Sequence, residues 1–290
     1  MSLAAAAEKE SGLSIEQVEQ RVQDESRKAR ARARRTEFLS PLLVTAALLL
    51  IWELAADFFE IPNYLFPAPS EILAACRDNA WILTRETGVT TVEILLGYAL
   101  SIAIGIPLAL GIFHWPVFSK AIYPILVSTQ AMPKVAVAPL FVVWFGFGLL
   151  PKVLIAFLIA FFPIVINTVM GLSAIEQEKI YLARSMGLSK FQTFLRIRLP
   201  NALPSIFAGL KISITLAVVG AVVGEFVGGD SGVGYQLMVA NGNMNTPLLF
   251  AGVLALTLLG LVLFAIVEFI ERMAMPHMER APGSIGAGTM

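Results

Sequence analysis

The side chains that could carry out chemistry in this 290-residue chain are few and far apart. Cys76 is the single cysteine, so the sequence predicts neither an internal disulfide nor a cysteine-ligated metal site. The two histidines, His114 and His277, are too widely separated to indicate a histidine metal centre. The sequence also lacks the phosphate-loop motif G-x-x-x-x-G-K-S/T and the catalytic motifs H-E-x-x-H and G-x-S-x-G. We therefore expect no enzymatic activity, cofactor or metal in this chain, and any ATP that drives it must be bound by another chain.

A second group of polar side chains lies inside long apolar stretches, where such residues are costly and often functional. We select Gln130, Lys134, Asn167 and Glu225 as candidate residues of a translocation pathway. Each has a simpler alternative role. Lys134 can extend to the membrane surface, and Gln130 and Asn167 can hydrogen-bond across helices. Glu93 and Glu225 lie near predicted outer helix ends, where they either meet lipid headgroups or, for Glu225, gate the outer mouth or contact a binding protein.

The composition identifies the elements that must position these residues. Apolar residues make up 57% of the chain and charged residues 14%, against about 25% charged in a typical soluble domain. A core of this size cannot hide so much apolar surface from water, so the lipid bilayer is implied as a second solvent. The net charge is zero, which argues against nucleic acid as a partner.

Six apolar stretches are each close to the length that crosses a bilayer as a helix. They are Phe38–Phe58, Val89–Phe113, Ala121–Phe145, Val153–Leu172, Ser205–Val227 and Leu248–Ile270. Because a chain in lipid must satisfy its own backbone hydrogen bonds, we predict an all-α membrane protein with six transmembrane helices. Residues 38–272 form this domain, preceded by a polar and basic arm (1–37) and followed by a disordered tail (273–290).

The distribution of Lys and Arg predicts the orientation, because cytoplasmic loops are enriched in these residues. With the basic arm inside, six crossings return the C-terminus to the same side. The loops then predicted inside hold Lys120, Lys179, Arg184, Lys190, Arg196, Arg198, Arg272 and Arg280. Those predicted outside hold Arg77, Arg85 and, in a tight turn, Lys152. We therefore place both termini in the cytoplasm, and we expect Lys211 to extend to the cytoplasmic interface.

Small residues and prolines predict two local features of the helices. Two stripes with a four-residue spacing favour close helix contact in lipid, within the chain or with a second copy. They are Gly97, Ser101 and Gly105, and Gly220, Gly224 and Gly228. Three prolines, Pro124, Pro133 and Pro139, predict that the third helix is broken, because each removes a backbone donor. A broken helix is tolerated where it lines a cavity, which makes residues 130–139 the candidate lining segment.

The longest predicted cytoplasmic loop, residues 173–203, contains signals for two short helices. Each helix begins at a potential capping box. The two boxes are Ser173 with Glu176 and Ser189 with Gln192. We expect the first helix to end at Gly187 and the second to stop by Pro200.

The second of these helices carries an apolar face formed by Phe191, Phe194 and Leu195. Such a face on a small cytoplasmic hairpin must be covered. The cover is the membrane domain of the same chain, the lipid surface or a soluble partner. Composition alone does not choose between these three.

The residue order in this loop resembles the EAA loop of binding-protein-dependent ABC importer permeases. That loop reads E-A-A, three residues, G, nine residues and I-x-L-P, and the spacings here match throughout. Tyr181 and Leu182 stand where the pattern has Glu and Ala. The resemblance implies that the hairpin sits in a groove of a cytoplasmic ATPase subunit. The residues implied in this coupling are Tyr181, Leu182, Ala183, Gly187, Phe191, Ile197, Leu199 and Pro200.

Further segments resemble the nitrate/sulfonate/taurine/bicarbonate branch of these permeases. They are Pro67-Ala68-Pro69-Ser70, Pro139-Leu140, Trp144-Phe145-Gly146, Phe162-Pro163-Ile164 with Asn167, and Gly232-Val233-Gly234-Tyr235. The resemblance implies a type I ABC importer permease fold in the bacterial inner membrane. It also implies a homodimer, two ATPase subunits that use ATP, and an extracytoplasmic solute-binding protein that delivers a small solute, nitrate-, sulfonate- or taurine-like or a vitamin precursor.

The alternative function is an ion-gradient-driven secondary transporter or channel. Inverted repeats with paired broken helices would be its signature. Residues 38–150 and 151–270 show no convincing match, and only one broken helix is predicted.

Overall fold

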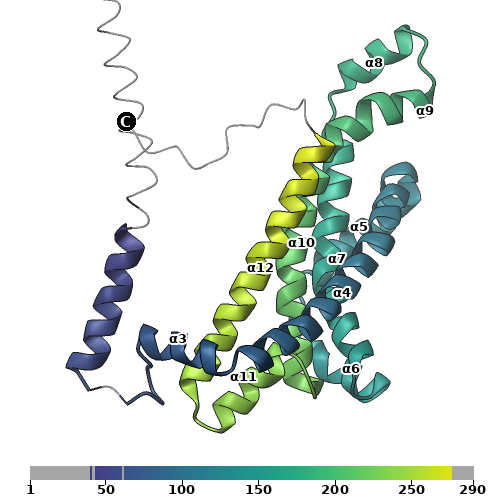
Figure 1. Cartoon of the computed structure of the whole chain (residues 1–290). Coiled ribbons are helices and arrows are strands. Elements are labelled where there is room, and N and C mark those ends of the chain that lie inside the picture. The colour runs from purple at the N-terminus through teal and green to yellow at the C-terminus, as the bar shows by residue number, and fades with distance from the viewer. Residues whose placement is uncertain (1–39, 41–42, 61, 276–290) are drawn as a thin grey trace, which may run out of the picture. The chain divides into compact units, whose positions relative to one another are not determined.

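The computed structural model describes residue 40 and residues 43–60 and 62–275. Every regular element in these ranges is a helix (Figure 1). The chain divides after Ser70 into two compact units. In the first, residues 43–58 are helical, which agrees with most of the predicted span Phe38–Phe58, and its beginning falls mainly outside the described residues. Within this unit the rings of Trp52 and Phe66 are 5.0 Å apart.

The remaining helices include four that are long and apolar enough to cross a membrane, among the residues described. In chain order the elements are α3 (Pro69–Asp78), α4 (Ala80–His114), α5 (Pro116–Thr129), the 3-10 helix η1 (Lys134–Val137), α6 (Ala138–Phe145), α7 (Leu149–Ser173), α8 (Gln177–Ser185), α9 (Lys190–Thr193), the π-helix η2 (Phe194–Arg198), α10 (Leu199–Gly228), α11 (Val233–Gly242) and α12 (Thr246–Ala274). The four long apolar segments are α4, α7, the continuous run Lys190–Gly228 and α12. The short helices α3 and α11 had no counterpart in the sequence prediction.

Helix α7 packs directly against α4 through the first stripe of small residues. A Cβ atom placed on Gly97 would lie 2.6 Å from the Cβ of Ala156, and one on Gly105 would lie 3.2 Å from Ile164. Between them, the Ser101 hydroxyl donates a hydrogen bond to the carbonyl of Phe157 over 3.1 Å. Equal steps along the two helices in the same direction show that α4 and α7 are parallel.

The second stripe brings α10 equally close to α7, with the two helices running in opposite directions. A Cβ on Gly220 would lie 2.6 Å from the Cα of Ala156, and one on Gly224 would lie 2.8 Å from the Cα of Lys152. The partners move by equal steps in opposite directions, so α7 and α10 are antiparallel. The prediction of close helix contact is confirmed for both stripes, and in both cases the contact lies within the chain.

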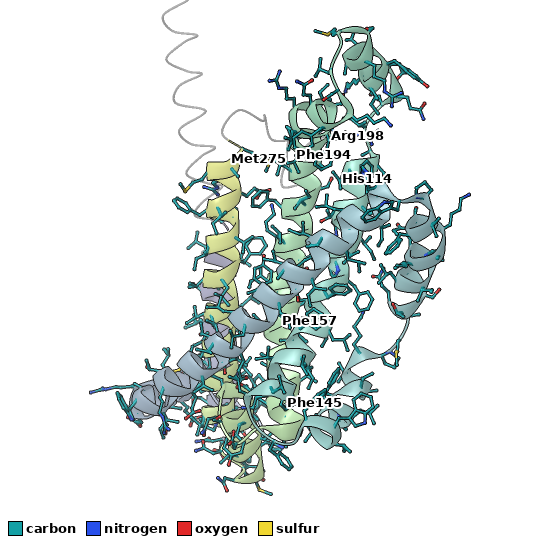
Figure 2. The ribbon with its side chains drawn as sticks, turned by 90° about the vertical axis from the view of Figure 1, so that its right-hand side faces the viewer. His114, Phe145, Phe157, Phe194, Arg198 and Met275 are labelled. Carbon is teal, nitrogen blue, oxygen red and sulfur yellow. The ribbon has the colours of Figure 1, made fainter. Side chains whose placement is uncertain are left out.

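The segment between α4 and α7 returns along the bundle, because those two helices are parallel. His114 precedes this segment and Phe145 is the last residue of α6 within it. Figure 2 places these two residues toward opposite ends of the second unit. The segment consists of α5 followed by η1 and α6. A bend of 89° separates α5 from the η1–α6 part, at a short break between them. Pro133 precedes η1 at this break and Pro139 lies in the first turn of α6. The predicted break is therefore confirmed at Pro133 and Pro139, whereas α5 continues through Pro124.

Replacing Gly220 by alanine should destabilise the bundle by about 1–3 kcal/mol, because the added Cβ overpacks the backbone of α7. Gly260 is the matched control, since it also lies inside a long helix and a Cβ there meets nothing within 4 Å. Gly260→Ala should leave stability unchanged or raise it by up to about 1 kcal/mol, because alanine favours the helix. Thermal unfolding of the two variants in detergent measures this difference. Equal midpoints would contradict the packing described above.

Candidate functional site

Two features stand out at opposite ends of the second unit. The hairpin formed by α8 and α9 protrudes at one end, and the loop leading into α11 lies at the other (Figure 1). Helix α7 reaches both ends, since Lys152 lies in its first turn and Ser173 is its last residue.

The end of α8 forms the turn that the sequence predicted at Gly187. The φ angle of Gly187 is +83°, in the left-handed region that favours glycine. The Gly187 N–H donates to the carbonyl of Arg184 over 3.0 Å, and the Leu188 N–H donates to the carbonyl of Ala183 over 3.1 Å. This pair of bonds is the Schellman motif, which satisfies carbonyls that a helix end otherwise leaves free.

One of the two predicted capping boxes is present. The Gln192 N–H donates to the Ser189 hydroxyl over 3.2 Å, and the Gln192 side-chain oxygen accepts from the Ser189 N–H over 2.9 Å. The other box is wrong, because α7 continues through Ser173 and Glu176 precedes α8 without a side-chain cap. The predicted stop at Pro200 is also wrong. The helical run Lys190–Gly228 continues through this proline, directly after the π-helix η2.

The tip of the hairpin carries large apolar side chains that the described residues leave uncovered. Leu182 is 62% exposed, Met186 71% and Phe191 70%. We call these three residues the hairpin apolar surface. Phe194, predicted on the same face as Phe191, instead packs at the base of the hairpin with the buried cluster that contains Leu172. The apolar face therefore has a covered base and an exposed tip.

The predicted coupling residues divide between these two parts of the hairpin. Tyr181, Leu182, Gly187 and Phe191 lie on the protruding part, where all four are exposed. Ala183 is 2% exposed. Ile197, Leu199 and Pro200 are half-buried where the hairpin joins α10. Their contact with a partner stays a prediction.

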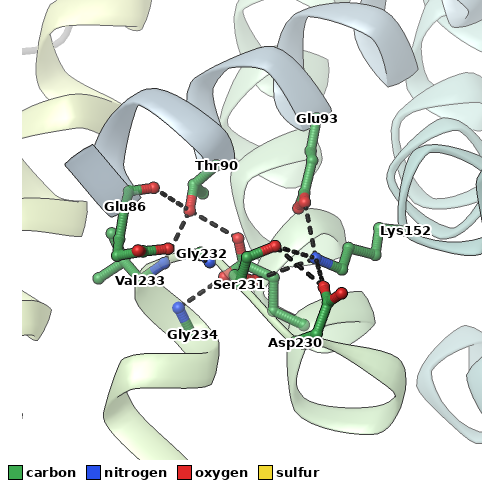
Figure 3. Close-up of polar contacts among 10 residues, drawn as sticks. Glu86, Thr90, Glu93, Lys152, Asp230, Ser231, Gly232, Val233 and Gly234 are labelled. Atoms are coloured by element: carbon green, nitrogen blue, oxygen red, sulfur yellow. Dashed lines mark hydrogen bonds and ion pairs between the residues drawn. The ribbon is translucent and has the colours of Figure 1, made fainter. Parts of the chain in front are cut away.

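At the opposite end, side chains from α4 and α10 hold the first turn of α11 (Figure 3). The Gly232 N–H donates to Oε2 of Glu86 over 2.7 Å, and the Val233 N–H donates to the Thr90 hydroxyl over 2.9 Å. The Gly234 N–H donates to Oε2 of Glu225 over 2.5 Å. A helix start leaves such N–H groups without partners and attracts negative charge, so acceptor side chains stabilise it.

A buried ion pair lies beside this turn (Figure 3). The Lys152 ammonium donates to Oε1 of Glu93 over 2.9 Å and to the carbonyl of Ser231 over 3.0 Å. Lys152 and Glu93 are each 1% exposed. Asp230 lies 3.7 Å from the ammonium and is mostly exposed. A hydrogen bond from the Ser231 hydroxyl, with the charge of Lys152 adding to it, lowers the pKa of the Asp230 carboxyl. These contacts join α4, α7 and the loop before α11.

This cluster corrects the interpretations of Lys152, Glu93 and Glu225. Lys152 is a buried partner inside α7, not part of a solvated tight turn. Glu93 and Glu225 are each 1% exposed and therefore do not lie among lipid headgroups. Outside this cluster, Lys211 pairs with Glu271 over 2.7 Å, and its extension to the cytoplasmic interface stays a prediction. No local sequence signal reveals these pairs, because their members are far apart in the chain.

The four candidate pathway residues do not converge on one place. Gln130 is exposed at the end of α5, and Lys134 begins η1 with its ammonium 4.8 Å from the ring centre of Phe162. The Asn167 side chain donates to the carbonyl of Pro163 within α7. Glu225 belongs to the cluster at α11. A role for any of them in translocation stays a prediction.

The described residues contain no group of three or more His, Cys, Asp or Glu side chains arranged to hold a metal ion. In the cluster at α11, both oxygens of Glu225 accept hydrogen bonds from the protein. Oε2 of Glu93 is buried without a partner in the described part of the chain.

Comparison with known proteins matches residues 101–279 to the family of binding-protein-dependent transport system inner membrane components. The formylaminopyrimidine transport permease protein ThiX of Halalkalibacterium halodurans is 37% identical over 243 residues, which cover 83% of this chain and 97% of the relative. The riboflavin transport system permease protein RibX of Chloroflexus aurantiacus is 37% identical over 235 residues, covering 80% and 88%.

A solved structure has the same fold. It is a chain from inward facing conformations of the MetNI methionine ABC transporter, with a TM-score of 0.57 and 20% identity. The match covers 68% of this chain and 97% of that one.

Replacing Lys152 by methionine should destabilise the protein by about 3–5 kcal/mol, because it leaves the Glu93 carboxylate buried without its partner. The double variant Lys152→Met/Glu93→Gln removes both charges and should recover most of the loss. Arg272→Met, which removes an exposed ion pair with Glu268, is the control and should change little. Thermal unfolding in detergent compares them. A Lys152→Met variant that unfolds like the wild type would contradict the buried pair.

Proposed function

This chain belongs to the binding-protein-dependent transport system inner membrane components, the permeases of ABC importers, and we propose that its hairpin couples solute passage to a separate ATP-binding subunit. The observation that carries this proposal is the hairpin apolar surface. Leu182, Met186 and Phe191 are all more than 60% exposed, although they lie on an ordered hairpin fixed by a Schellman motif and a capping box. An exposed apolar surface on a defined element favours a protein partner.

The proposed topology has six crossings, with both termini and the hairpin in the cytoplasm. Five traversals come from α4, the bent α5–α6 segment, α7, α10 and α12, and the helical residues 43–58 supply the sixth. The distribution of basic residues supports this orientation, since the hairpin and its base are rich in them. They are Lys179, Arg184, Lys190, Arg196 and Arg198. At the other end Lys152 is neutralised by Glu93.

The proposed assembly contains two copies of this chain, two ATP-binding subunits and an extracytoplasmic binding protein. Both small-residue stripes already pack against α7, so the contact between copies would use other surfaces. The end that carries α11 would face the binding protein. There Asp230 and the loop after α10 are held in place by Lys152 and by the first turn of α11.

The proposed solute is small, and a vitamin or vitamin precursor is favoured over a strongly charged anion. Two relatives at 37% identity are named for formylaminopyrimidine and riboflavin. Of the candidate pathway residues, Lys134 is the only cation, and its ammonium lies over the ring of Phe162. The sulfonate- and taurine-like solutes implied by the sequence resemblance are the second class to test.

Replacing Gly187 by valine should uncouple the hairpin, because a β-branched residue at a positive φ angle carries strain of about 1–3 kcal/mol. We expect ATP hydrolysis stimulated by the liganded binding protein to fall by about tenfold or more. The amount of permease in the membrane should stay the same. Gly187→Asn should retain most of the activity, because asparagine tolerates the left-handed region.

Gly88→Ala is the control for this experiment, since Gly88 lies in α4 and a Cβ there meets nothing within 4 Å. It should behave like the wild type. Full stimulation in Gly187→Val at a normal membrane level would rule out the coupling role of the hairpin.

A further inference from the structure

A pocket of about 400 Å³ lies between the hairpin and the ends of the long helices. It is lined by Phe113 at the end of α4, Ser173 at the end of α7, Gln177, Tyr181 and Arg184 on α8, and Arg198 at the end of η2. Figure 2 shows His114, Arg198 and Phe194 together in this region. Three elements of the bundle and the hairpin therefore contribute to one pocket.

The pocket contains two arginines, and the described residues provide no carboxylate partner for either. The guanidinium of Arg198 lies 4.9 Å from the ring centre of Phe113, in a cation–π contact. Arg184 belongs to none of the ion pairs formed by the described residues. Guanidinium groups bind phosphate and carboxylate groups through paired N–H donors. Ser173, Gln177 and Tyr181 add further polar groups to the lining.

The pocket lies on a different face of α8 from the hairpin apolar surface. Its residues on α8 are Gln177, Ile180, Tyr181 and Arg184, spaced as one face of a helix. Leu182 and Met186 of the hairpin apolar surface lie on the opposite face of the same helix. An occupant of the pocket therefore meets the ends of α4 and α7, where the apolar spans stop. Of the predicted coupling residues, Tyr181 alone also lines the pocket.

We propose that this pocket binds a phosphate group, carried by the headgroup of an anionic phospholipid in the adjoining leaflet. Phe113, Ile175 and Ile180 in the lining fit the position of the pocket at the edge of the apolar spans. The cytoplasmic leaflet is the negatively charged one, so the proposal rests on the orientation given above. A bound phosphate would join Arg184 of the hairpin to Arg198 beside α10 and so hold the hairpin against the bundle.

The test uses the permease purified with its ATP-binding subunits and stripped of lipid, then titrated with phosphatidylglycerol or phosphatidylcholine. Native mass spectrometry counts the lipids bound. The wild type should bind phosphatidylglycerol in preference, and the double variant Arg184→Gln/Arg198→Gln should bind it about tenfold more weakly. Lys179→Gln/Arg196→Gln is the matched control, because it removes the same charge from α8 and η2 outside the pocket lining. This control should bind like the wild type.

A second arm identifies the source of the phosphate. Competition by excess inorganic phosphate in the wild type but not in the Arg184→Gln/Arg198→Gln variant would support the phosphate site and assign it to free phosphate. The absence of competition, with lipid binding retained, would support the headgroup.

Three results would overturn the proposal. The first is equal binding of the two lipids by the wild type, and the second is an equal loss in both double variants. The third is unchanged lipid binding with loss of ATPase co-elution in Arg184→Gln/Arg198→Gln alone, which would assign the arginines to an acidic group of that subunit. Loss of lipid binding in Arg184→Gln/Arg198→Gln, with normal co-elution of the ATP-binding subunit, would support the lipid site and leave the coupling role of the hairpin intact.

Discussion

The close approach of α7 to both α4 and α10 is the contact on which the rest of this structure depends. At Gly97 and Gly220 there is no room for a further carbon atom, and both glycines meet the same short stretch of α7 around Ala156. In lipid, where the hydrophobic effect does not drive helices together, such close packing is a main source of association. Because α7 carries Lys152 at one end and leads into the hairpin at the other, a displacement of this helix would be felt at both ends.

The second constraint is that polar groups in an apolar surrounding must find partners within the protein. At the end that carries α11, three consecutive N–H groups find such partners, since they donate hydrogen bonds to Glu86, Thr90 and Glu225. The ammonium of Lys152 likewise donates hydrogen bonds to Glu93 and to the carbonyl of Ser231. Glu225, the candidate gating residue, accepts one of these bonds and so helps to position the start of α11.

The features that the sequence predicted correctly are those encoded within a few residues. Runs of apolar residues located the long helices, Pro133 and Pro139 located the break before α6, and Gly187 located the end of α8. The errors arose where a local signal competed with a distant one. Ser173 and Glu176 match a capping box, but Ser173 is the last residue of α7 and the next helix begins only at Gln177.

The buried pairs could not be found in this way. Lys152 and Glu93 are 59 positions apart, and Gly232 and Glu86 are 146 apart, so no spacing rule connects them. The members of each pair meet only because α4, α7 and α10 are packed in one register. A single sequence contains the residues but not that register.

The central claim is that the exposed tip of the hairpin is the surface that receives the ATP-binding subunit. A photo-reactive amino acid placed at Leu182 in the assembled importer tests it most directly. Phe147 is the control site, because it is at least as exposed (79% against 62%) but lies just before the start of α7, at the other end of this helix from the hairpin. The account predicts a covalent adduct with the ATP-binding subunit from position 182 and none from position 147. No adduct from position 182 in an assembled, active complex would contradict it.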